Sequence, residues 1–164
     1  MNYKILTILI LGLLMVPSCS VKHVAATNKT EQQRLALMME ALEGFISNTP
    51  YCALIQYTSV DVVPVPDPYP DDDDVEEKHV YHAKVLETYR GQQLDNISYI
   101  ETTESGEGAH ISAEPVVVTL CVDKDEFFWA GTGSVYPATD EVIKAARRIS
   151  QKVKSVKQSF TFCE

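Results

Sequence analysis

Residues 116–130, VVVTLCVDKDEFFWA, predict a β-hairpin that organises the rest of the fold. The segment 116–122 is rich in β-branched side chains and the segment 126–130 in aromatic ones, and both compositions favour strands. The intervening DKD at 123–125 has the polar residues that tight turns prefer. The chain therefore contains an antiparallel strand pair against which its other segments can be placed.

Three strands are predicted upstream of this hairpin, from segments that share β-branched and aromatic residues. They are residues 52–65 (CALIQYTSVDVVPV), 80–89 and 96–103. The connection between the first two, 67–78 (DPYPDDDDVEEK), is dense in proline and acid and is expected to be a solvated loop. A three-stranded meander thus precedes the hairpin.

Two helices are predicted, one before the strands and one after them. Residues 31–47 repeat apolar side chains at helical spacing, and a capping-box pattern begins at Thr30. Thr139 is the expected N-cap of the second helix, whose apolar stripe runs to Val156. The tail at 159–163, SFTFC, is expected to add a short edge strand.

This order of elements predicts a mainly β protein with flanking helices, of the α+β class. A three-stranded meander followed by a hairpin suits a five-stranded barrel of the oligonucleotide/oligosaccharide-binding (OB) type, with one helix before it and one after it. We expect a signal peptide at 1–18, a tether at 19–30 and a single globular domain at 31–164.

The first residues carry the pattern of an export signal. Lys4 supplies a positive charge, and the apolar stretch at 5–16 is shorter than the about 18 residues that a membrane span needs. Residues 16–19, VPSC, resemble a bacterial lipobox, which implies lipidation of Cys19. The protein is expected to be exported to the cell envelope as an outer-membrane lipoprotein facing the periplasm or the exterior. An ordinary cleaved signal peptide with an incidental cysteine is the alternative.

The charge balance argues against nucleic acid as a partner. The chain has 14 Lys and Arg against 23 Asp and Glu, which gives a formal net charge of −9. Sequence-independent binding to phosphates requires basic side chains that release counterions, and this composition has no excess of them. The expected partners are the membrane, through the lipid anchor, and a protein or glycan.

Three cysteines remain after Cys19, namely Cys52, Cys121 and Cys163. In an oxidising compartment one disulfide is expected, and one thiol is left over. The first and fourth strands of the predicted barrel are antiparallel neighbours, which favours a disulfide between Cys52 and Cys121. The rival pairing joins Cys163 to either of these two cysteines.

The strand segments also resemble the netrin-like domain, the barrel shared by tissue inhibitors of metalloproteinases and small bacterial secreted proteins. The resemblance covers about residues 50–140, and its most specific piece is VLETYRG at 85–91. It is carried by YCALIQYTSV, YHAKVLETYRG, ISYIETTESG, VVVTLC and FFWAGTG. Those inhibitors chelate zinc through an N-terminal CxC motif, which this sequence lacks, so metalloproteinase inhibition is not implied.

No motif of an enzyme or a cofactor site is recognised. His79 and His82 have an odd separation, which on a strand places them on opposite faces and predicts surface or rim histidines rather than a shared metal site. Gly131–Ser134 lacks the lysine of a P-loop, and no GxSxG nucleophile elbow occurs. We therefore expect no catalytic residue, no cofactor and no metal.

The densest aromatic cluster is the candidate interaction surface. Alternation along a strand places Phe127 and Trp129 on one face and Phe128 on the other. Phe128, Trp129 and Tyr136 are the residues predicted to contact a partner, although core packing competes with this role. The expected function is a non-enzymatic binding or interaction module, and the alternative is a structural or stress-related lipoprotein without a specific ligand.

The anchor is tested by the substitution Cys19→Ala. Burying acyl chains in a bilayer contributes about 0.8 kcal/mol per CH₂, so the wild type is expected in the membrane fraction and the variant in the soluble fraction. Intact mass of the protein purified from its host measures lipidation and cleavage together. A wild-type protein that fractionates as soluble contradicts the anchor.

Overall fold

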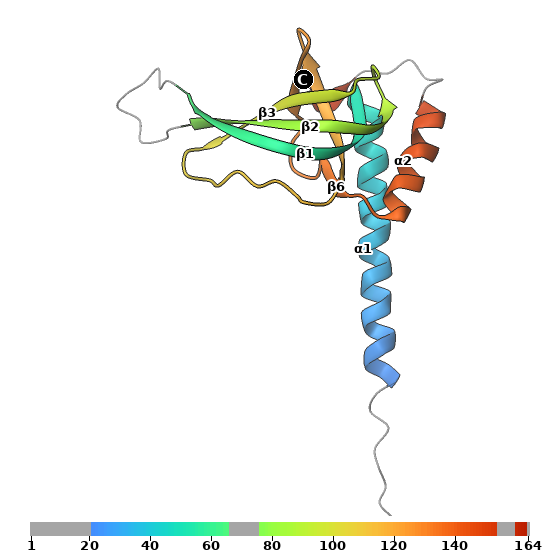
Figure 1. Cartoon of the computed structure of the whole chain (residues 1–164). Coiled ribbons are helices and arrows are strands. Elements are labelled where there is room, and N and C mark those ends of the chain that lie inside the picture. Colours follow the sequence, from blue (N-terminus) through green and yellow to red (C-terminus); the bar gives the residue numbers. More distant parts are fainter. Residues whose placement is uncertain (1–20, 66–75, 154–159, 164) are drawn as a thin grey trace, which may run out of the picture. The chain divides into compact units, whose positions relative to one another are not determined.

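The structure, a computed structural model, describes residues 21–65, 76–153 and 160–163 (Figure 1). The predicted signal peptide, the predicted lipidation site at Cys19 and most of the acidic connection lie outside these residues. The chain divides into a first unit up to Leu35 and a second unit from Ala36 onward. The barrel and the candidate site belong to the second unit.

Five strands close into a barrel of the OB type, as predicted. β1 pairs antiparallel with β2 and β4, β2 pairs antiparallel with β3, β3 runs parallel to β5, and β5 forms a hairpin with β4. The sixth strand, β6, pairs with β4 and was not predicted. The bounds are Tyr51–Pro64 for β1, Glu76–Arg90 for β2, Asn96–Glu104 for β3, Val116–Asp123 for β4, Glu126–Trp129 for β5 and Val135–Pro137 for β6.

The predicted hairpin is confirmed as β4 and β5, joined by a two-residue turn. Asp123 pairs with Glu126, and the two residues between them have positive φ, 47° at Lys124 and 73° at Asp125. Positive φ at both central residues is the geometry of a type I′ turn, whose twist matches that of the flanking strands. The turn therefore fixes the register of this strand pair.

The barrel interior forms one hydrophobic core. Because alternate residues of a strand face opposite sides, Tyr51, Ala53 and Ile55 of β1 point inward while Cys52 and Leu54 point outward. The other inward residues are Tyr81, Ala83, Ile97, Tyr99, Val116, Val118 and Leu120.

A second core lies between the outer face of the barrel and the helices. The helix α1, Val21–Asn48, contributes Leu42 and Ile46, and the helix α2, Asp140–Val153, contributes its apolar stripe. The remaining members come from the strands and from α2: Cys52, Tyr89, Val117, Tyr136, Val142, Ala145, Ala146 and Ile149. Each helix is therefore held by the apolar face that its sequence periodicity predicts.

The helix boundaries agree with the sequence at α2 and differ at α1. The hydroxyl of Thr139 accepts a hydrogen bond from the backbone N–H of Val142 at 3.3 Å, which confirms Thr139 as the N-cap. Residues 21–30, expected to be an irregular tether, are helical. This stretch contains no glycine or proline that would end a helix.

The predicted disulfide is wrong, and the rival pairing of Cys163 with a strand cysteine is found. Cys121 is bonded to Cys163, with 5.4 Å between their Cα atoms, and Cys52 is a buried free thiol. In the β1–β4 ladder Cys52 lies opposite Thr119, two residues before Cys121. Such diagonal neighbours lie about 7 to 8 Å apart with their Cβ atoms only somewhat closer, which exceeds the about 4 Å between the Cβ atoms of a disulfide.

The C-terminal tail is a 3₁₀ turn, η1 (Thr161–Cys163), and not the predicted edge strand. The ring of Phe162 packs edge-on against Phe45 of α1 at 5.0 Å between centroids, and the Thr161 hydroxyl donates a hydrogen bond to Asn48 Oδ1 at 3.1 Å. These side-chain contacts and the disulfide hold the tail against α1 and β4 in place of a strand ladder.

Removing the disulfide with Cys163→Ser is expected to lower the free energy of unfolding by up to about 4 kcal/mol, the chain-entropy value for a loop that spans a sequence separation of 42. Urea unfolding measures the loss. Adding reductant is expected to destabilise the wild type and to leave the variant unchanged, which provides the control. A crosslinked peptide containing Cys52 in a non-reducing digest contradicts the pairing.

Candidate functional site

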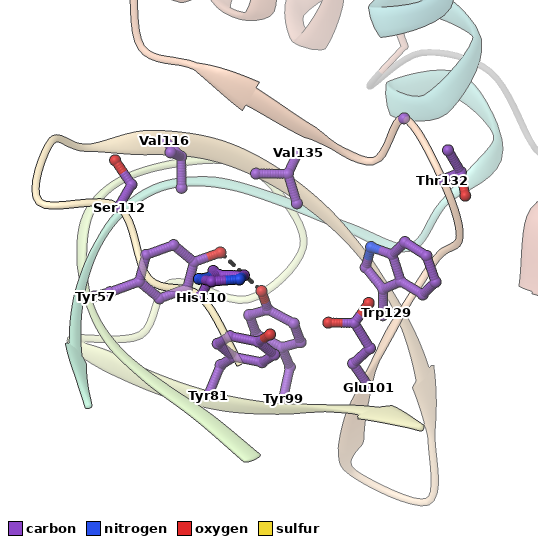
Figure 2. Close-up of a pocket in the computed structure, with 11 residues that line it drawn as sticks. Tyr57, Tyr81, Tyr99, Glu101, His110, Ser112, Val116, Trp129, Thr132 and Val135 are labelled. Carbon is purple, nitrogen blue, oxygen red and sulfur yellow. Dashed lines mark hydrogen bonds between the residues drawn. The ribbon is translucent and has the colours of Figure 1, made fainter. Parts of the chain in front are cut away.

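The barrel interior opens into a pocket of about 340 Å³, a size within the range of small-ligand sites (Figure 2). Residues of all six strands form its walls, and the loops before β4 and before β6 complete it. The lining residues are Tyr57, Tyr81, Tyr99, Glu101, His110, Ser112, Val116, Trp129, Thr132, Gly133 and Val135.

Three tyrosines from three neighbouring strands form one side of the pocket. Tyr81 and Tyr99 are directly opposite each other in the β2–β3 ladder, and their rings stack at 4.9 Å with 16° between planes. Tyr57 lies where the register of β1 against β2 shifts, between Tyr57 and Ser59. Such irregularities turn side chains relative to the regular pleat, and the Tyr57 ring stands at 50° to Tyr81.

The hydroxyl groups of Tyr57 and Tyr99 hydrogen-bond each other at 2.8 Å, the dashed line in Figure 2. Either oxygen is able to donate, so one lone pair and one proton are used inside the pair. This bond ties β1 to β3 and fixes both rings.

Burial keeps these phenols in their neutral form. Desolvation raises the pKa of Tyr57, Tyr81 and Tyr99 above the usual value, because an ionised phenolate is poorly solvated inside the barrel. The negative charge of Glu101 raises the pKa of Tyr81 further. At neutral pH the pocket therefore presents protonated hydroxyl groups, which are not activated as nucleophiles or bases.

Glu101 is the only carboxylate among the described residues that line the pocket, and no lysine or arginine is among them. It follows Tyr99 by two residues on β3 and so faces the same side of the sheet. In Figure 2 its carboxylate lies between Tyr81 and Trp129. Neither Glu101 nor the tyrosines were predicted as site residues, although all of them occupy inward positions of predicted strands.

The three residues predicted as an interaction surface separate in the structure. Trp129 lines the pocket, with Phe127 on its side of β5, so the predicted alternation is confirmed. Phe128 faces away from the barrel interior and is half-buried. Tyr136 is 4% exposed, so its surface assignment is wrong: it pairs with Val117 on the outer face of the sheet and packs against Phe45.

The histidines of β2 lie on opposite faces, as predicted. His82 is at the surface, where its ring nitrogens contact Ser98 at 2.7 Å and Asp61 at 2.9 Å. The prediction of a surface position is wrong for His79, which is buried with Nε2 2.8 Å from Glu77 Oε1. Glu77 and His79 share the inward face of the strand, where the loop after β3 reaches Glu77 through a backbone hydrogen bond from Gly106.

Neither histidine belongs to a metal centre that the structure shows. Within the part of the chain that is described, no three His, Cys, Asp or Glu side chains are grouped so as to hold a metal ion.

Among the same residues no helix has the length and apolar character required to cross a membrane. Comparison with known proteins finds no matching family model and no matching curated protein.

The raised tyrosine pKa values predict loss of stability in alkali. The unfolded chain releases phenolic protons near pH 10, whereas the folded protein retains them. The contribution of these three tyrosines to the free energy of unfolding is therefore complete below about pH 10 and decreases above it. Urea unfolding between pH 8 and 11 measures the slope, and Tyr99→Phe is expected to reduce it. Ionisation of every tyrosine at pH 11 in the folded protein, followed by absorbance near 295 nm, would contradict the burial of these phenols.

Proposed function

We propose that the protein is a non-enzymatic binding module of the cell envelope, and that a group of its partner occupies the pocket in the barrel. The observation that supports this most directly is the set of aromatic walls around a hollow of about 340 Å³. Ligand sites are typically concave, largely apolar and equipped with a few polar groups, and this pocket has that composition.

The state of the polar groups supports binding rather than catalysis. Protonated tyrosines are weak nucleophiles and weak bases, and no histidine or serine in hydrogen-bond contact activates the Tyr57–Tyr99 pair within the described residues. The pair is still able to hydrogen-bond a ligand, through the one proton and the lone pairs that its mutual bond leaves unused. The module is accordingly assigned a recognition role.

Export and the lipid anchor at Cys19 belong to the same proposal, as does the netrin-like resemblance of the barrel. Anchoring through a lipid places a binding module at the membrane and leaves its pocket free to meet a protein or glycan. The alternative, a structural lipoprotein without a specific ligand, gives no role to a hollow with aromatic walls.

Filling the pocket tests the proposal. Trp129 is the only tryptophan of the chain and lines the pocket, so its fluorescence is expected to report occupancy by a member of a panel of neutral sugars, amino acids and organic amines. Val135→Phe adds a ring at the pocket wall and is expected to weaken binding at least about tenfold, since a bulky side chain removes ligand volume.

Val62→Phe is the matched control, because Val62 is exposed on β1 and does not line the pocket. Its affinities are expected to equal those of the wild type. A panel in which no compound changes Trp129 fluorescence saturably, or binding that Val135→Phe leaves unchanged, would contradict the proposed function.

A further inference from the structure

The pocket lining contains three tyrosines and one tryptophan, which come from four different strands. The stacked pair Tyr81 and Tyr99 forms one wall, and Tyr57 stands at 50° and 47° to these two rings. Trp129 contributes a further wall from β5 (Figure 2). The negative faces of such rings attract a cation placed within about 6 Å of their centroids, and indole is the most effective of them.

The charge of the pocket has one sign. Glu101 is the single carboxylate of the described lining, and the lining residues include no lysine or arginine. His110 carries a positive charge only when protonated, and it is exposed. A ligand anion would meet Glu101 without a compensating cation, whereas a ligand cation would be attracted by both the carboxylate and the rings.

The hydrogen-bond inventory distinguishes a methylated cation from a sugar. A sugar brings many hydroxyl groups, each of which needs a partner after leaving water. Two of the three tyrosine hydroxyls in the pocket already bond each other at 2.8 Å, so a sugar would depend mainly on Tyr81, Glu101 and the loop residues His110, Ser112 and Thr132. A methylated ammonium group has few or no N–H donors, so it loses little hydrogen bonding when it enters a site with aromatic walls.

We infer that the pocket binds a methylated ammonium group, with Tyr57, Tyr99 and Trp129 around the methyl groups and Glu101 balancing the charge. This inference rests on the proposed function and names the chemistry of its ligand. Such a group occurs in free choline and in the phosphocholine headgroup of a lipid or glycan. The volume of about 340 Å³ accommodates the group and part of its substituent.

The test compares choline with its uncharged isostere 3,3-dimethyl-1-butanol, in which carbon replaces the nitrogen. Isothermal titration of the wild-type protein at pH 8, where an imidazole is ordinarily neutral, measures both affinities. Choline is expected to bind at least about tenfold more tightly than the isostere, because the two share shape and differ in charge. Equal affinities overturn the inference.

Two charge variants separate the pocket carboxylate from the general acidity of the chain. Glu101→Gln is expected to weaken choline binding about fivefold or more, whereas Glu104→Gln, an exposed position on the same strand outside the pocket, is expected to change it less than twofold. Both substitutions alter the net charge equally. Equal losses in the two variants overturn the inference, because they assign the attraction to bulk charge.

Titration with phosphocholine identifies the source of the methylated ammonium group and keeps this inference distinguishable from the proposed function. Phosphocholine that binds as tightly as choline supports the inference with a headgroup as the source, and phosphocholine that binds several-fold more weakly supports it with a free methylated amine. If neither compound binds while another member of the panel occupies the pocket, the inference is wrong and the proposed function stands. If nothing occupies the pocket, both are wrong.

Discussion

The antiparallel pairing of β1 with β4 closes the barrel, and both hydrophobic cores depend on it. Its register, with Tyr51 opposite Leu120 and Ile55 opposite Val116, sets which residues face inward on both strands. Because successive side chains alternate, the same pairing directs Cys52 and Val117 outward to the helices. A shift of one residue would exchange the two sets, so burial on both sides specifies one register strongly.

Local signals in the sequence were sufficient for the five barrel strands, the two helices and their order. The hairpin turn and the Thr139 cap depend on a few adjacent residues, and both are found. The predicted barrel class is also found, because five strands of this order have few ways to close. By contrast, β6 is three residues long and ends in Pro137, so its strand character comes from the edge of β4 that it covers.

The features that the sequence did not predict depend on register between distant segments. Choosing the disulfide required knowing that Cys121 lies two residues past the partner of Cys52, which no spacing in the sequence reveals. The pocket has the same origin: Tyr57 and Tyr99 are 42 residues apart and meet only after β1, β2 and β3 are aligned. Both tyrosines occupy inward-facing positions of their strands, and this shared orientation was the signal available in the sequence. It indicates a common pocket only once the strand partners are known.

Apolar burial is divided between two layers, of which the inner one also contributes residues to the pocket. The helices pack on the outer face of the barrel, where Leu42, Ile46 and Ile149 are fully or almost fully buried, and the disulfide joins the tail to that side. The pocket is lined by inward-facing residues of the barrel together with Val135 of β6 and the loops before β4 and β6. The outer layer supplies much of the apolar burial that stabilises the domain. This outer burial offsets part of the desolvation cost of placing tyrosine hydroxyls in the barrel interior.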